Sequence, residues 1–167
     1  MRIMSETTDA TAPSDARLHD LSAIRRMAFS TVCLILIQAG TGMAANLHVN
    51  IPDHPGSDPT NYFTGSVRSI AWVLSNGAVV LVIHVVFGFA LAVLVVSTLI
   101  RIVKLKRPSL NLWTTIGALF VIGAGLSGTS FLDFNNNMSS FIMEVLGFAS
   151  ALCYTVVLFL SYEHPYH

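Results

Sequence analysis

Charged residues are scarce in this sequence. Only 11% of its 167 residues are Asp, Glu, Lys or Arg, and the formal net charge is zero. Soluble proteins carry about 25% charged residues. A neutral chain lacks the strongly basic or acidic surface that attracts nucleic acid or another highly charged partner. We therefore expect no nucleic-acid partner.

Cysteine is also rare, and the usual catalytic motifs are missing. The two cysteines, Cys33 and Cys153, both lie within apolar runs, so we expect free thiols that pack as small apolar groups rather than a disulfide. The sequence contains no Cys-x-x-Cys pair, phosphate-binding loop or nucleophile elbow. No catalytic residue is therefore predicted, and an enzymatic activity, if there is one, would be electron transfer.

Apolar residues, in contrast, are abundant. They make up 53% of the chain, and its mean hydropathy is +0.66. Several runs are long enough for the roughly 20 residues that cross a bilayer as a helix. We expect an all-α, integral membrane four-helix bundle in contact with the lipid bilayer. The spans are expected at about 27–46, 73–100, 110–132 and 138–162, with 69–76 at the membrane interface.

The polar segments predict the orientation. Residues 1–24 lack the apolar stretch of a signal peptide and are expected to be a disordered tail. Basic residues precede the first span and fill 101–107, and cytoplasmic loops are typically positive. Both termini, including the tail 163–167, are therefore expected in the cytoplasm of a cell-membrane protein. The loops 47–69 and 133–137 then face outward, and the first, rich in Pro and Gly, is expected to be irregular.

The two halves of the chain resemble each other. Residues 34–40 can be laid on 119–125, and residues 83–92 on 142–151, where Gly-Phe-Ala recurs. Chance is the alternative, because membrane helices draw on few residue types. A true duplication predicts two antiparallel hairpins about a pseudo-twofold axis along the membrane normal.

This alignment pairs His84 with Met143, and each is followed four residues later by a glycine, Gly88 and Gly147. Positions i and i+4 share a helix face, so each potential ligand lies beside a gap that could receive the edge of a flat macrocycle. Haem iron accepts a His/Met pair. The pattern indicates haem b, with His84 and Met143 as iron ligands. Structural interpretations also remain: a buried hydrogen-bonded histidine, a core methionine and glycines that allow close helix packing.

Other polar residues have less specific interpretations. Glu144, near the outer end of the fourth span, could be a proton or cation site, or could reach toward water and its helix N-terminus. Gln38 lies within the first span without an assigned purpose. The first outer loop holds residues whose types suit a divalent metal, although their spacing matches no strong signature: His48, Asp53, His54 and Asp58.

Part of the first half resembles the haem A synthase family. The matching stretches are 37–43, with its Gln and glycines, then 51–56, which is similar to the family's outer-loop segment, and then His84. The resemblance covers about residues 30–90. It implies a helical fold of half the family's usual length and a haem-ligating role for His84.

The chain also departs from the family pattern. Val80 and Val85 stand where the family has a Glu and an Arg near the histidine, and the loop cysteines are absent. Met143 stands where a second histidine is expected. The resemblance therefore implies the fold and one haem, but not oxidation of a haem methyl group.

Three functions remain open from the sequence. The first is a b-type haem protein that transfers electrons or handles haem, with a membrane redox complex or a second copy as partner. The second is a cofactor-free accessory or scaffold subunit, in which His84 only hydrogen-bonds a neighbour. The third is a small transporter or proton path through His84, Glu144 and Gln38, because ionisable residues within a span mark such pathways.

Overall fold

The computed structural model describes residues 12–49, 61–134 and 137–162, and these ranges contain helices and no strand. This confirms the predicted all-α class. The helices are α1 (Ala12–His48), α2 (Tyr62–Asn76), α3 (Val79–Leu105), α4 (Pro108–Phe134) and α5 (Asn137–Leu160).

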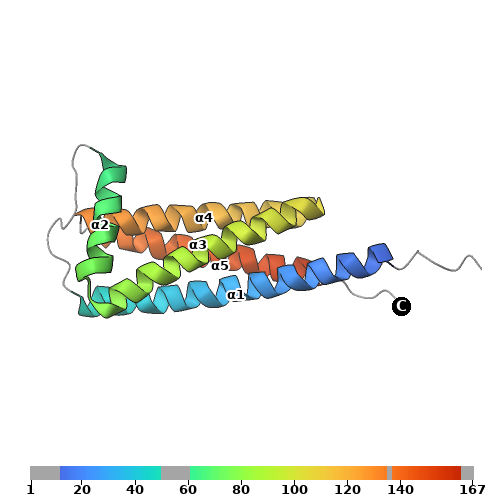
Figure 1. Cartoon of the computed structure of the whole chain (residues 1–167), viewed down its shortest axis with the longest axis horizontal. Coiled ribbons are helices and arrows are strands. Elements are labelled where there is room, and N and C mark those ends of the chain that lie inside the picture. The colour runs from blue at the N-terminus through green and yellow to red at the C-terminus, as the bar shows by residue number, and fades with distance from the viewer. Residues whose placement is uncertain (1–11, 50–60, 135–136, 163–167) are drawn as a thin grey trace, which may run out of the picture.

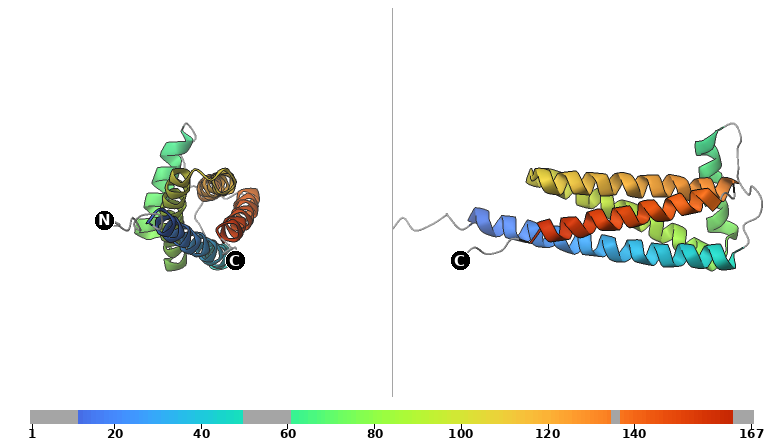
Figure 2. Two further views of the ribbon diagram at one scale, coloured as in Figure 1. Left: turned by 90° about the vertical axis from the view of Figure 1, so that its right-hand side faces the viewer. Right: turned by 180° about the vertical axis from the view of Figure 1, so that it is seen from behind.

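The four long helices form a bundle, and α2 lies across one of its ends (Figure 1). Both α1 and α4 pack against α3 and α5. Within the described ranges α1 does not contact α4, and α3 does not contact α5. The helices therefore follow the ring order α1, α3, α4, α5, as the view along the bundle shows (Figure 2). Hence α1 and α4 occupy opposite corners, which is the placement that the predicted repeat requires.

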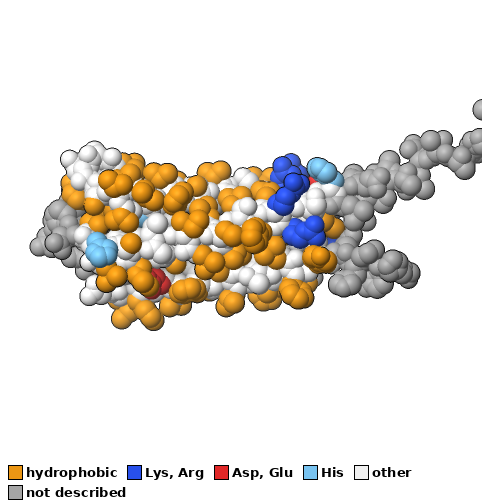
Figure 3. Space-filling view, turned by 90° about the horizontal axis from the view of Figure 1, so that it is seen from below, with side chains coloured by type: hydrophobic (Ala, Val, Ile, Leu, Met, Phe, Trp, Pro, Cys, Tyr) orange, Lys and Arg blue, Asp and Glu red, His pale blue; other side chains and the backbone are white. Residues whose placement is uncertain are grey.

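The bundle has the surface of a membrane protein. Four helical segments are long and apolar enough to cross a bilayer, which confirms the predicted multi-pass bundle: His19–His48, Val79–Leu105, Pro108–Phe134 and Asn137–Leu160. On the face that Figure 3 shows, apolar side chains lie along the length of the bundle, while Lys and Arg gather at one end. We call this the basic end, where Lys106 and Arg107 connect α3 to α4. The opposite end, where α2 lies, is the α2 end.

Small hydroxyl side chains are buried in the core beside the apolar ones. Thr31 and Thr98 are fully buried. Each donates a hydrogen bond to a carbonyl one turn back on its own helix, Thr31 to Met27 at 2.9 Å and Thr98 to Leu94 at 2.7 Å. Because these bonds satisfy the hydroxyl group within the helix, threonine can lie between helices without an unpaired polar group.

The predicted disordered tail, residues 1–24, is wrong from Ala12 onward, because α1 begins there. Leu21 and Ile24 are 4% and 1% exposed, and they belong with Ala28 to the main core cluster. Their spacing of three and four residues puts them on one helix face. Burial of that face stabilises the extension of α1 beyond the expected span. The residues before Ala12 lie outside the described ranges.

The predicted second span, 73–100, is divided in the structure. α2 ends at Asn76, Gly77 has extended backbone with φ −72° and ψ 155°, and α3 begins at Val79. The residues 69–76, expected at the membrane interface, belong to α2, which crosses the bundle end (Figure 1).

The predicted irregular loop 47–69 is also partly helical. α2 begins at Tyr62 because Asn61 caps it: the Asn61 side-chain oxygen accepts hydrogen bonds from the backbone N–H groups of Phe63 at 3.1 Å and Thr64 at 3.3 Å. Asparagine is among the best residues for this position. The Pro- and Gly-rich part of the loop lies outside the described ranges.

The last two spans agree with the prediction to within two residues at each end. The tight turn before α4 explains its sharp start. Lys106 takes the left-handed conformation with φ 53°, and Pro108 follows as the first residue of α4. Proline is favoured at the first helical position because its fixed φ fits the helix and its missing N–H has no partner there anyway.

Candidate functional site

His84 lies on α3, half-buried, and turns its ring toward α1. The Thr41 hydroxyl oxygen is 3.1 Å from Nδ1 of the ring. The Gln38 amide nitrogen is 3.2 Å from Nε2 and also donates to the backbone carbonyl of His84 at 3.0 Å. We call these three residues the polar clamp, since they join α1 to α3 by side-chain hydrogen bonds.

The chemistry of the partners assigns the protons of the clamp. An amide nitrogen only donates, so Nε2 of His84 accepts from Gln38. The ring then carries its proton on Nδ1 and donates it to Thr41. The Thr41 hydroxyl in turn donates to the carbonyl of Ile37 at 3.0 Å or of Gln38 at 3.1 Å. This chain of bonds describes a neutral histidine with a fixed tautomer and a lone pair on Nε2.

Two glycines make the close approach of α1 and α3 possible at this level. A Cβ on Gly42 would lie 2.9 Å from Cε1 of His84, and a Cβ on Gly88 would lie 3.1 Å from the Gln38 amide nitrogen. Gln38, Thr41 and Gly42 share one face of α1 because they are spaced by three and four residues. The gap beside Gly88, predicted as room for a macrocycle edge, holds the Gln38 amide in this structure.

One atom of the clamp has no partner. The side-chain oxygen of Gln38 is buried and accepts no hydrogen bond from any residue that the structure describes. Exchanging the amide oxygen and nitrogen would direct the oxygen at the His84 carbonyl, which is also an acceptor, so the orientation with nitrogen toward His84 is favoured. The clamp therefore contains one unused acceptor next to the histidine.

Met143 and Gly147 of the predicted site lie on α5. The Met143 sulfur is 3.0 Å from the position that a Cβ on Gly128 of α4 would take. Gly147 has open space where a Cβ would be, with no atom within 4 Å. The structure thus places the His84 ring against α1 and the Met143 sulfur against α4, on two helices, α3 and α5, that do not contact each other in the described ranges.

The remaining candidates do not converge on the clamp. Glu144 is half-buried on α5, and His48 is exposed at the end of α1. Asp53, His54 and Asp58 lie outside the described ranges. In the part of the chain that the structure describes, no group of three or more His, Cys, Asp or Glu side chains is close enough to hold a metal ion.

A second polar cluster lies at the α2 end, and it was not predicted. Asp133 of α4 is 1% exposed. Ser69 of α2 donates a hydrogen bond to one of its carboxyl oxygens, and Ser66 lies 3.5 Å from the other. Nearby, the Tyr62 hydroxyl donates to the Leu126 carbonyl at 2.6 Å. These contacts hold α2 on α4, so we call Asp133, Ser66 and Ser69 the α2 latch.

One signal for this latch was present in the sequence. Gly65, Ser66, Ser69 and Val73 are the buried residues of α2, and their spacing gives one helical face of small side chains. Such a face indicates a helix that packs closely against another element. The sequence alone did not identify Asp133 as its partner.

Comparison with known proteins adds no family to this description. No protein-family model matches the chain, and neither a curated protein nor a solved structure gives a significant match.

Proposed function

We propose that this chain is a membrane protein that binds haem b through Nε2 of His84. The observation that carries the proposal is the contact between Nδ1 and Thr41 at 3.1 Å. A histidine that ligates a metal almost always donates its other ring N–H to a fixed acceptor. With the Nδ1 proton held by Thr41, the lone pair lies on Nε2, which is the atom that haem iron requires.

Gln38 would have to move aside for Nε2 to reach iron. Its amide nitrogen makes two contacts with His84, one to the ring and one to the backbone carbonyl, while its oxygen is buried without a partner among the described residues. An unsatisfied buried acceptor costs about 1–3 kcal/mol. Rotation of the amide toward water, or toward a donor on the ligand, would offset part of the lost hydrogen bonds. The residues at the site therefore fit a ligand that displaces Gln38 from Nε2.

The haem iron would supply one-electron chemistry within the membrane, while the chain's own residues bind and orient it. His84 would hold the iron and Thr41 would fix the ring, and the lack of a side chain at Gly88 would leave room once Gln38 has moved aside. Met143 is outside this proposal because its sulfur lies against α4. Its predicted role as a ligand, with Gly147 beside it, stays a prediction.

A cofactor-free accessory subunit is the second candidate. The specific observation in its favour is that both ring nitrogens of His84 already have partners on α1. In this alternative the polar clamp only holds α1 and α3 in register. Polar contacts between membrane helices contribute about 0.6–2 kcal/mol, which is enough to fix the relative position of two helices.

The charge distribution supports an orientation with the basic end in the cytoplasm of the cell membrane, because cytoplasmic loops carry an excess of Lys and Arg. Both chain termini would then be cytoplasmic, and the α2 end would face outward. A reporter fused after His167 should be active in the cytoplasm, and a cysteine introduced at Thr64 should react from outside. Reaction of that cysteine only after the membrane is opened would reverse the orientation.

The haem proposal is tested by the reduced-minus-oxidised spectrum of protein made with ample haem. Wild type should give the bands of a b-type haem. His84→Ala should lower the amount of haem bound per protein at least tenfold. His48→Ala, which removes an exposed histidine, should leave that amount unchanged. Gln38→Ala should retain haem or bind it more tightly, because Nε2 is then unobstructed. A colourless wild type, or haem that survives His84→Ala, would overturn the proposal.

The accessory-subunit interpretation predicts a different pattern. Gln38→Ala and His84→Ala should each lower the melting temperature without any spectral change. The double variant should lose about as much stability as either single one, because both changes break the same contact. Additive losses would argue against a shared structural contact.

A further inference from the structure

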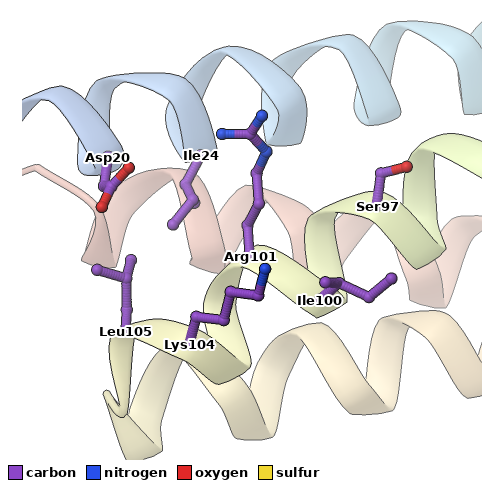
Figure 4. A pocket seen from close by; sticks show the side chains of 7 residues that line it. All are labelled: Asp20, Ile24, Ser97, Ile100, Arg101, Lys104 and Leu105. Atoms are coloured by element: carbon purple, nitrogen blue, oxygen red, sulfur yellow. The ribbon is translucent and has the colours of Figure 1, made fainter.

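A cavity of about 530 Å³ lies between α1 and α3 at the basic end. It is within the range of roughly 300–1,000 Å³ that small-molecule sites occupy. Its lining residues come from two helices (Figure 4): Asp20 and Ile24 from α1, and Ser97, Ile100, Arg101, Lys104 and Leu105 from α3. No residue of the polar clamp lines this cavity, so the two are separate sites.

The polar part of the lining is cationic. Arg101 and Lys104 are three residues apart on α3 and so share a helix face, and both line the cavity (Figure 4). Both are exposed, and neither has an ion-pair partner among the described side chains. Asp20 contributes the one carboxylate of the lining. Two cations beside one carboxylate leave an excess positive charge that an anion can neutralise.

The rest of the lining is mostly apolar. Ile24 is 1% exposed, and Ile100 and Leu105 continue the wall along α3. The Ser97 hydroxyl donates its proton to the Val93 carbonyl at 2.7 Å. Arg101 and Lys104 are therefore the side chains of the lining that can donate to an anion. The site lies at the last turns of a helix that is apolar enough to span the bilayer. The cations at the end of the span suit a phosphate group, and the apolar wall beside them suits the acyl chains attached to it.

We propose that this cavity binds the headgroup of an anionic phospholipid, with the phosphate between Arg101 and Lys104. Basic pockets between membrane helices suit such headgroups. Asp20 restricts the choice: its carboxylate can accept hydrogen bonds from headgroup hydroxyls but repels a headgroup carboxylate. The lining therefore fits a hydroxylated headgroup such as phosphatidylglycerol better than phosphatidylserine. This proposal is independent of haem binding.

The test is equilibrium binding of fluorescent phosphatidylglycerol to the full-length protein in neutral detergent. Wild type should show one saturable site, with phosphatidylcholine as the neutral reference and phosphatidylserine weaker than phosphatidylglycerol. Arg101→Gln with Lys104→Gln should weaken binding roughly 30-fold, since each cation near a lipid surface contributes about 1 kcal/mol and 1.4 kcal/mol is tenfold. Arg26→Gln with Lys106→Gln removes the same charge outside the cavity lining and should weaken it less than about threefold.

A second variant keeps the charges and removes the space. Ser97→Phe places an apolar ring on the cavity wall and should reduce binding at least tenfold while thermal stability in detergent stays within a few degrees. Equal losses in the two double variants would show binding to surface charge alone and would overturn the site. Displacement of the lipid by millimolar inorganic phosphate would overturn the lipid assignment, because free phosphate would then suffice.

Discussion

The α2 latch makes a prediction that can be worked from its geometry. Ser69 is fully buried and donates to Asp133, which is 1% exposed. Ser69→Ala leaves a buried carboxyl oxygen without this donor, and removing one partner of a buried hydrogen bond costs about 1–3 kcal/mol. Ser66 lies at 3.5 Å from the other oxygen, which is the limit of a hydrogen bond, so Ser66→Ala should cost under about 1 kcal/mol.

Ser75 provides the matched control on the same helix. It is exposed, and its hydrogen bonds to described residues stay within α2: it donates to the carbonyls of Ala71 at 2.8 Å and Trp72 at 3.2 Å and accepts from the Asn76 side-chain amide at 2.8 Å. A surface change of this kind usually stays within about 0.5 kcal/mol. The predicted order of destabilisation is therefore Ser69→Ala, then Ser66→Ala, then Ser75→Ala.

Hydrogen exchange of the purified protein in detergent is the appropriate assay, because it reports local opening segment by segment. A cost of about 2 kcal/mol should speed exchange of the α2 amides roughly 30-fold. The amides of α5 should keep their rates, since the latch does not include that helix. Equal effects of Ser69→Ala and Ser75→Ala would refute the latch. Faster exchange of every helix by the same factor would show a global loss of stability instead.

Two further predictions concern glycines at helix contacts, with Gly40→Ala as the control for both, since a Cβ there meets no atom within 4 Å. Gly42→Ala puts a Cβ 2.9 Å from the His84 ring and should lower the free energy of unfolding by about 1–3 kcal/mol; an unchanged denaturation midpoint would contradict the close approach of Gly42 to His84. Gly117→Ala puts a Cβ 2.9 Å from the Tyr154 ring and should cost a similar amount, about 1–3 kcal/mol. Gly40→Ala should be neutral or stabilise by about 0.5–1 kcal/mol, because alanine is the better helix former.

The membrane-spanning part of the fold was predictable because insertion into a bilayer depends on the length of apolar runs, which can be read directly from the sequence. Uninterrupted apolar runs predicted α4 and α5 to within two residues at each end. The start of α1 was missed, because charged residues flank Leu21 and Ile24 on both sides and only their shared helix face indicates that they are buried. The break at Gly77 was missed although Ser75 and Asn76 precede it, because the apolar residues on both sides were assigned to one long span.

The site was predictable only in part. His84 could be identified because an ionisable side chain within a span is unusual, and Gln38 was noted without a role. Their contact joins residues 46 positions apart in the sequence, and it depends on the relative register of α1 and α3. The helical period predicts which residues share a face of one helix, but it does not predict which faces of two helices contact each other. The same limit hid the contact of Ser69 with Asp133, which are 64 positions apart.

At the aligned positions His84 and Met143, the two helix pairs make contacts of different chemistry. In α4 and α5, glycine allows close apolar packing, with Gly128 against the sulfur of Met143. In α1 and α3, the residue aligned with Met143 is His84, and it is held by hydrogen bonds to Gln38. Polar contacts between membrane helices contribute only about 0.6–2 kcal/mol. Stability alone therefore does not require a histidine at this position, since the second hairpin pairs its helices without one. This difference favours a functional role for the polar clamp and directs the first experiments to His84 and Gln38.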